Sequence, residues 1–178
     1  PDVMVHRTTT LDLPFALKKR LKSLVTGARP PSTHHGAGAT AAKPNLLKRV
    51  FQDLLLPDPQ VTWLPILTRA ARRIVRERSI DLVIITGAPY SDYLLSERLR
   101  QSFPHLAIVL DFRDEWLSTT FDNVSFLFSS TERTRNVAQK AEASAVTNAT
   151  AIVAVTEAAR REIRGRYAQE PDSKFKLI

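Results

Sequence analysis

Three carboxylates, an arginine and a tryptophan follow directly after an apolar run in this sequence. The run is residues 108–110, and the stretch after it is Asp111, Phe112, Arg113, Asp114, Glu115 and Trp116. A continuous apolar run is typical of a buried parallel strand, and ligand sites in open α/β sheets lie beyond the carboxyl ends of such strands. Carboxylates beside a guanidinium therefore make this stretch a candidate site for a polar ligand. The alternative is a salt-bridged loop, because structural ion pairs also gather these residue types.

Two other apolar runs are also followed directly by residues that could bind a ligand. Residues 81–87 predict a buried strand that continues into residues 88–91, and residues 151–156 predict a third strand followed by Glu157. The ends of parallel strands in one sheet share an edge and can line one crevice. We therefore expect the three ends to surround a single cleft. The binding residues predicted there are Pro89, Tyr90, Ser91, Arg113, Trp116 and Glu157.

A helix is expected directly after the first of these strands. Serine is a favoured N-cap residue, so Ser91 is predicted to begin a helix over residues 92–102. Leu94, Leu95 and Leu99 give that helix an apolar face. Its N-terminus would point toward the cleft and favour an anionic group there.

The order of strand, helix and strand indicates β-α-β units, which form parallel sheets through right-handed crossovers. We therefore predict an α/β fold: a Rossmann-like parallel sheet with helices on both faces, forming one domain over residues 1–178. Strands near 82–86, 107–111 and 151–155 should be adjacent and parallel. Residues 29–44, rich in Gly, Pro and Ala, are expected to form a flexible loop. Further helices are expected around residues 15–25, 45–56, 62–78, 131–147 and 157–167, a β-like segment over 3–7, and the start of a strand at 175–178.

Composition narrows the classes of protein. The chain of 178 residues is 43% hydrophobic and 25% charged, as in a soluble globular domain. It has no cysteine, which excludes disulfides and thiolate metal sites. No apolar run approaches the length of a membrane-spanning helix. The chain opens on Pro-Asp without a signal peptide, so we expect a fragment.

The positive charge is concentrated at the amino-terminal end. Residues 1–50 hold nine Lys/Arg against two Asp, which accounts for most of the net charge of +8. Such an end can bind an acidic membrane surface, nucleic acid or an acidic small molecule, or it can be a solvated face. Five further arginines lie in residues 62–78. No aromatic residues that could stack on bases interleave with them, so we interpret them as a solvated face.

Four blocks of the sequence together resemble a known family. They are residues 56–63 with Leu-Pro-Asp and Trp63, residues 80–89, the motif of residues 111–116, and residues 142–156 with Glu142. In order and spacing these blocks are similar to the amino-terminal domain of bacterial glycosyltransferases of family 4. One subgroup of that family carries an Asp-Phe-Arg-Asp-x-Trp motif after a strand. The resemblance covers most of residues 50–178, and residues 174–178 resemble the beginning of the interdomain linker.

The resemblance implies one half of a GT-B enzyme involved in cell-surface polysaccharide synthesis. This half binds the acceptor, a saccharide or lipid-linked molecule, and the nucleotide-sugar donor binds a second domain expected to be absent from this chain. Transfer in the family is retaining and needs no metal, and we expect no cofactor. The implied location is the cytoplasm, with attachment to the inner face of the membrane as an alternative. A second copy of the chain could cover the wall left exposed, and no nucleic-acid partner is expected.

The resemblance also suggests roles for the residues after the second strand. Asp111, Asp114 and Glu115 are the candidates to accept or orient the proton of the acceptor hydroxyl. Arg113 could hold an anionic acceptor group or keep a carboxylate ionised, and Trp116 could stack on a sugar ring. The rival functions are a non-catalytic binding or regulatory domain, since a fold does not fix a function, and a basic nucleic-acid-binding module.

Overall fold

The computed structural model describes residues 3–8, 57–87, 89–114, 117 and 132–178. The predictions of helices around 15–25 and 45–56, of a loop over 29–44, and of site residues Glu115 and Trp116 lie outside these residues. The elements in chain order are η1 (Pro59–Trp63), α3 (Leu64–Arg78), β1 (Leu82–Thr86), η2 (Tyr90–Leu94), α4 (Leu95–Ser102), β2 (Ala107–Phe112), α6 (Glu132–Asn148), β3 (Ala151–Ala154), α7 (Glu157–Arg166), η3 (Asp172–Lys174) and β4 (Phe175–Leu177).

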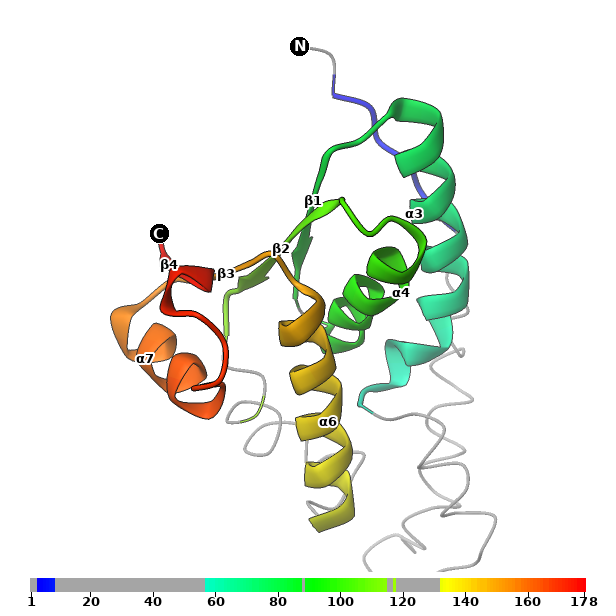
Figure 1. Cartoon of the computed structure of the whole chain (residues 1–178). Helices are drawn as coiled ribbons and strands as arrows, with labels where there is room; N and C mark the ends of the chain where they lie inside the picture. The colour runs from blue at the N-terminus through cyan, green and yellow to red at the C-terminus, as the bar shows by residue number, and fades with distance from the viewer. Residues whose placement is uncertain (1–2, 9–56, 88, 115–116, 118–131) are drawn as a thin grey trace, which may run out of the picture. The chain divides into compact units, whose positions relative to one another are not determined.

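The four strands form one sheet in the order β1-β2-β3-β4, and every pair is parallel. The register places Thr86 opposite Asp111 and Phe112 opposite Ala154, so the carboxyl ends of three strands lie close together. The predicted adjacency of the first three strands is confirmed, and so is the short strand near the end of the chain. The α/β class with a Rossmann-like parallel sheet flanked by helices is confirmed as well (Figure 1).

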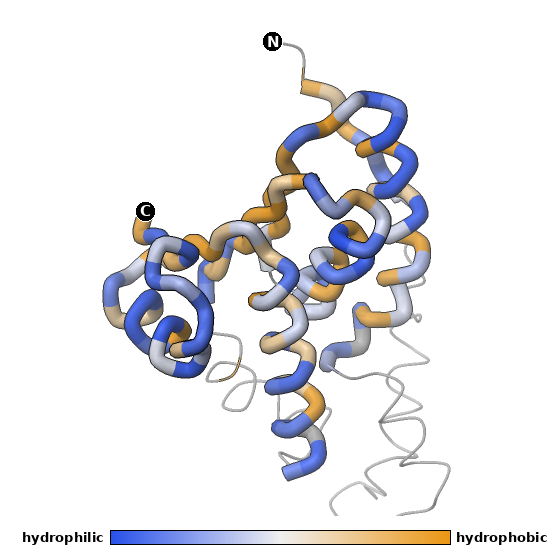
Figure 2. The backbone as a smooth tube through the Cα atoms, in the orientation of Figure 1, coloured by the Kyte–Doolittle hydropathy of each residue, from blue (hydrophilic) through white to orange (hydrophobic). Residues whose placement is uncertain are grey.

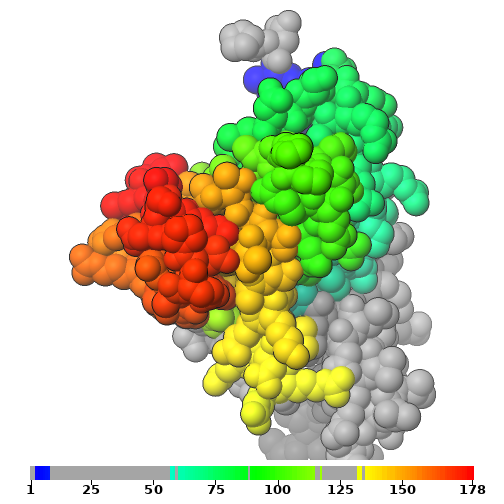
Figure 3. All heavy atoms as spheres, in the orientation of Figure 1, coloured from blue at the N-terminus to red at the C-terminus, as the bar shows by residue number. Residues whose placement is uncertain are grey.

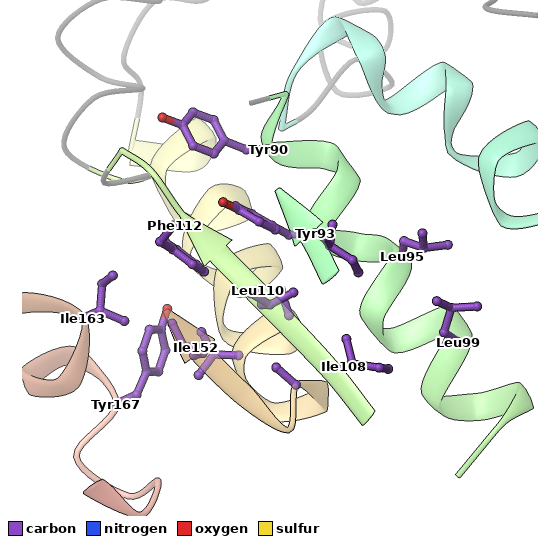
Figure 4. Close-up of a cluster of buried hydrophobic side chains, with 14 of the residues drawn as sticks. Tyr90, Tyr93, Leu95, Leu99, Ile108, Leu110, Phe112, Ile152, Ile163 and Tyr167 are labelled. Atoms are coloured by element: carbon purple, nitrogen blue, oxygen red, sulfur yellow. The ribbon is translucent and has the colours of Figure 1, made fainter. Parts of the chain in front are cut away.

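The core lies between one face of the sheet and a layer of four helices. Each step from one strand to the next moves in the same direction across the sheet, so right-handed crossovers put α4, α6 and α7 on the same face. Helix α3 joins this layer by packing against α4. Apolar side chains from strands and helices meet there (Figure 4): the sheet contributes Ile108, Leu110, Phe112 and Ile152, the helices contribute Leu95, Leu99 and Ile163, and Tyr167 follows directly after α7.

The opposite face of the sheet is also apolar. Leu82, Ile84 and Val155 lie on it, and Ile84 is 62% exposed. Figure 2 shows that hydrophobic residues concentrate along the strands, whereas α7 is largely hydrophilic. Burial on both faces is what a continuous apolar run predicts. Helices on this second face stay a prediction, because all the helices that the structure describes lie on the first.

Two details of the prediction are corrected. Residues 3–7 do not form a strand: they pair with no strand of the sheet, and Val3 is 88% exposed. The helix after β1 begins with a 3-10 turn, η2, before the α-helical part at Leu95. The predicted helices near 62–78, 131–147 and 157–167 are confirmed as α3, α6 and α7. Among the described residues, no helix is long and apolar enough to cross a membrane.

Candidate functional site

The ends of β1 and β2 are joined through the carboxylate of Asp111. The hydroxyl of Thr86 donates to Asp111 Oδ2 at 3.2 Å, and Arg113 Nε donates to the same oxygen at 2.9 Å. The side chain of Asp111 is 14% exposed, whereas that of Arg113 is 64% exposed. The largely buried carboxylate of Asp111 therefore orients the exposed guanidinium of Arg113 at the carboxyl ends of the strands.

Tyr93, on η2, fixes the backbone of both strand ends. Its hydroxyl donates to the carbonyl of Asp111 at 2.6 Å and accepts from the backbone N–H of Gly87 at 3.1 Å. Its ring stacks on Phe112 with 4.7 Å between centroids and 8° between planes (Figure 4). Burial raises the pKa of Tyr93, so the hydroxyl keeps the proton that it donates. Sequence reasoning missed this residue, because nothing in its neighbourhood distinguishes it from an ordinary core tyrosine.

The close approach of Tyr93 explains why a glycine ends β1. A Cβ atom at position 87 would lie 2.6 Å from both Cζ and the hydroxyl oxygen of Tyr93. That distance is far inside van der Waals contact, and the ring cannot move without breaking its stacking and both hydrogen bonds. Only glycine therefore fits at this position without displacing the tyrosine.

We expect Gly87→Ala to lower the free energy of unfolding by about 2 kcal/mol, because overpacking forces side chains and backbone to shift. Gly165→Ala is the matched control. Apart from its chain neighbours and the backbone of its own helix, no atom lies within 4 Å of a Cβ at Gly165, which is a helical residue of α7. Alanine there should therefore stabilise by about 0.5–1 kcal/mol. Urea unfolding of both variants checks the prediction. Equal effects of the two substitutions would contradict it.

The N-terminus of η2 is capped by a carboxylate from far away in the chain. Asp58 is 9% exposed, and its Oδ2 accepts from the backbone N–H of Ser91 at 2.7 Å. Its Oδ1 accepts from the N–H of Gln60 at 3.0 Å and so caps η1 as well. The predicted N-cap function of Ser91 is wrong: the cap residue is Pro89, without a side-chain bond, and Ser91 lies inside η2. The place at this helix end where an anionic ligand was expected is therefore taken by the carboxylate of Asp58.

Replacing Asp58 with alanine should lower the free energy of unfolding by about 2–3 kcal/mol, because two capped N–H groups, that of Ser91 being buried, would lose their acceptor. Asp58→Asn keeps one carbonyl oxygen and should cost about half as much. Chemical denaturation of the two variants at neutral pH is the measurement. An alanine variant as stable as the wild type would show that the double cap contributes nothing.

Burial also perturbs two acids at this corner. Burial raises the pKa of Asp58 despite its bonds from Ser91 and Gln60. Burial and the nearby charge of Asp58 raise the pKa of Asp92 from 3.8 to about 6. Folding therefore favours protonated Asp92. The stability that this protonated carboxyl contributes is fully present below pH 3.8, the ordinary pKa of an aspartate, and is lost as the pH rises through about 6.

Asn at position 92 resembles the protonated acid at every pH. We expect Asp92→Asn to raise the free energy of unfolding by about 1 kcal/mol at about pH 8, after allowance for partial exposure, and by less at about pH 5. Unfolding measured at both pH values tests this. If the stability difference between the variant and the wild type did not grow from about pH 5 to about pH 8, ionisation of Asp92 would not destabilise the folded protein.

The remaining predicted site residues that the structure describes differ in their burial and in their partners. Tyr90 and Ser91 are buried, and Pro89 is half-buried, so this loop faces the core more than the solvent. Asp114 is exposed and makes no hydrogen bond or ion pair with another described residue. Glu157 pairs with Arg160 at 2.8 Å and with Arg161 at 2.9 Å on its own helix.

These two guanidinium groups lower the pKa of Glu157 to about 2. The carboxylate is therefore fully ionised at neutral pH and already paired. In the described part of the chain, the structure brings together Thr86, Gly87, Asp111 and Arg113, and its hydrogen bonds do not link Glu157 to them. A single cleft that includes Glu157 stays a prediction.

No three His, Asp or Glu side chains of the described residues are grouped so that they could hold a metal ion. The elements and their contacts define an α/β protein with a Rossmann-like parallel sheet. Comparisons of the chain with protein-family models, with curated proteins and with solved structures find no match.

Proposed function

We propose that this chain is the acceptor-side domain of a retaining, family 4-like glycosyltransferase. The full enzyme would move a sugar from a nucleotide-sugar to a saccharide or lipid-linked acceptor. One observation carries the proposal: adjacent parallel strands join Thr86, Asp111 and Arg113 by hydrogen bonds at the edge where α/β proteins bind ligands. Asp111 and Arg113 belong to the Asp-Phe-Arg-Asp motif, which is one of the four blocks that carry the family resemblance.

The exposed groups of this motif suit an acceptor hydroxyl. Sugar transfer needs a group that accepts or orients the proton of that hydroxyl. Asp114 has an exposed carboxylate that is not used in a hydrogen bond to another described residue, so it is available for this purpose. Arg113 is anchored by Asp111 and still 64% exposed, so its guanidinium can hold an anionic acceptor group beside the reacting hydroxyl.

We assign the donor nucleotide to a second domain. The sequence has no Gly-rich phosphate loop after a strand. The helix end that sequence reasoning offered to an anion, the start of η2, already carries the carboxylate of Asp58. A nucleoside diphosphate placed there would compete with the Asp58 side chain, which already accepts the N–H of Ser91. This chain therefore supplies one wall of the active site and, by itself, should not transfer sugar.

Two measurements test the proposal. Calorimetric titration of the chain with uridine and guanosine diphosphate sugars should show no tight binding. The intact polypeptide that carries the chain should release nucleoside diphosphate from one of these donors when an acceptor is present. Tight donor binding by the chain alone would overturn the half-enzyme assignment. Failure of the intact polypeptide with every donor would favour a non-catalytic binding domain.

A further inference from the structure

An open groove of about 410 Å³ lies between residues of α3 and α4. The two helices pack against each other, and their atoms are neighbours in the space-filling view (Figure 3). The described residues of its lining include five arginines and no acidic side chain. They are Arg69, Arg72, Arg73, Arg76 and Arg98, together with Pro65 and Thr68. Five like charges around one hollow repel each other, so the groove concentrates positive charge in a small volume.

The positive charge of the groove is not neutralised from within the described residues. None of the five guanidinium groups makes an ion pair with a described carboxylate, although several arginines of α7 do. The acid closest in sequence to Arg98 is engaged elsewhere: Glu97 accepts from Ser144 at 2.9 Å and from Gln101 at 3.4 Å. The groove therefore presents an unbalanced charge that an external anion would offset.

Two of these arginines are held in place rather than freely solvated. Arg72 is half-buried, and its Nη2 donates to the carbonyl of Arg98 at 3.1 Å. Its Nε is shielded from solvent and has no partner among the described residues. Arg76 lies over the ring of Phe103 at 5.9 Å from the centroid. Guanidinium groups that are already positioned lose less freedom when they bind a ligand.

We propose that this groove binds a phosphate group, presented either by a small phosphorylated compound or by a phospholipid headgroup. A phosphate offers several oxygens to the paired N–H donors of arginine, and it carries enough charge to offset more than one guanidinium. The groove is formed by the two helices, whereas Arg113 and Asp114 follow a strand end. The proposal therefore does not depend on the assignment of this chain to a glycosyltransferase.

The test uses inorganic pyrophosphate as a soluble probe in calorimetry and vesicles with or without phosphatidylglycerol in a sedimentation assay. Arg73→Gln removes an exposed charge from the groove, and Arg78→Gln removes the same charge from the same helix outside the lining. We expect Arg73→Gln to weaken binding about fivefold to tenfold, and Arg78→Gln less than about twofold. Arg72→Lys keeps the net charge but loses the guanidinium fork, so it should also weaken binding about fivefold.

The results of the two binding assays distinguish a soluble phosphate ligand, a lipid headgroup and general charge attraction. Saturable pyrophosphate binding that is weakened about fivefold or more in the groove variants and kept in Arg78→Gln supports a soluble phosphate ligand. The same pattern with phosphatidylglycerol vesicles, and only weak binding of pyrophosphate, supports a lipid headgroup. Equal weakening by Arg73→Gln and Arg78→Gln shows general charge attraction and overturns the proposal, as does the absence of binding in both assays. Circular dichroism confirms that the variants are folded.

Discussion

Replacing Glu142 with alanine should lower the free energy of unfolding by about 3 kcal/mol, because removing one partner of a buried ion pair leaves the other uncompensated. Glu142 is fully buried in α6. Its Oε1 accepts from the hydroxyl of Tyr167 at 2.8 Å and from Arg166 Nε at 3.1 Å. Alanine would leave the phenol hydroxyl and part of the guanidinium without an acceptor, and would open a cavity between α6 and α7.

The matched variant is Glu142→Gln, which keeps a carbonyl oxygen for the two donors. Burial raises the pKa of Glu142, although Arg166 and Tyr167 oppose the shift. The wild-type protein therefore loses stability as the pH rises through the raised pKa, and the glutamine variant should not. We expect glutamine to change stability by less than about 1 kcal/mol at neutral pH and to be the more stable form at alkaline pH.

Unfolding by guanidinium chloride across a pH series measures both effects. An alanine variant that unfolds at the same midpoint as the glutamine variant would show that the hydrogen bonds to Glu142 do not hold α7 in place. The result bears on the site as well, because α6 and α7 flank β3, whose end lies beside β2. Glu142 thus acts as a structural group, although the family resemblance drew attention to it.

The strands were predictable from sequence because a buried parallel strand is a continuous apolar run. Residues 82–86 and 151–154 show this pattern, and both are strands. The helix starts were harder. Ser91 has the side chain of an N-cap, but the cap comes from Asp58, which lies 33 residues earlier in the chain. Local pattern cannot reveal a partner at that separation, because it depends on how η1 packs against η2.

The site was predictable only in part, because some of its contacts join residues that are far apart in the chain. Position after a strand identified Asp111 and Arg113, and the two are in contact. Tyr93 reaches the site because η2 turns its ring onto Phe112, which no sequence period encodes. The arginines of α3 were interpreted as a solvated face, since periodicity places them away from the sheet. That interpretation could not include Arg98, which comes from α4 and completes the groove.

Among the strand-end carboxylates, Asp114 should matter most for the proposed reaction. In the intact polypeptide, Asp114→Asn should reduce turnover by about 100-fold or more, the usual contribution of a positioned acid or base. Donor binding should stay within about twofold, because the variant changes only the group that meets the acceptor hydroxyl. Asp111→Asn should act through Arg113, whose Nε it holds at 2.9 Å, and should mainly weaken acceptor binding.

Asp81→Asn is the matched control, since Asp81 is an exposed aspartate that precedes β1, at the opposite edge of the same sheet. It should leave both turnover and acceptor binding unchanged. Steady-state kinetics with separate measurement of donor affinity distinguishes the three variants. Unchanged turnover in Asp114→Asn would remove that carboxylate from the site. Asp111→Asn could lose activity only because less of the protein is folded. Lower thermal stability with normal turnover per folded molecule would then assign Asp111 to the fold rather than to acceptor binding.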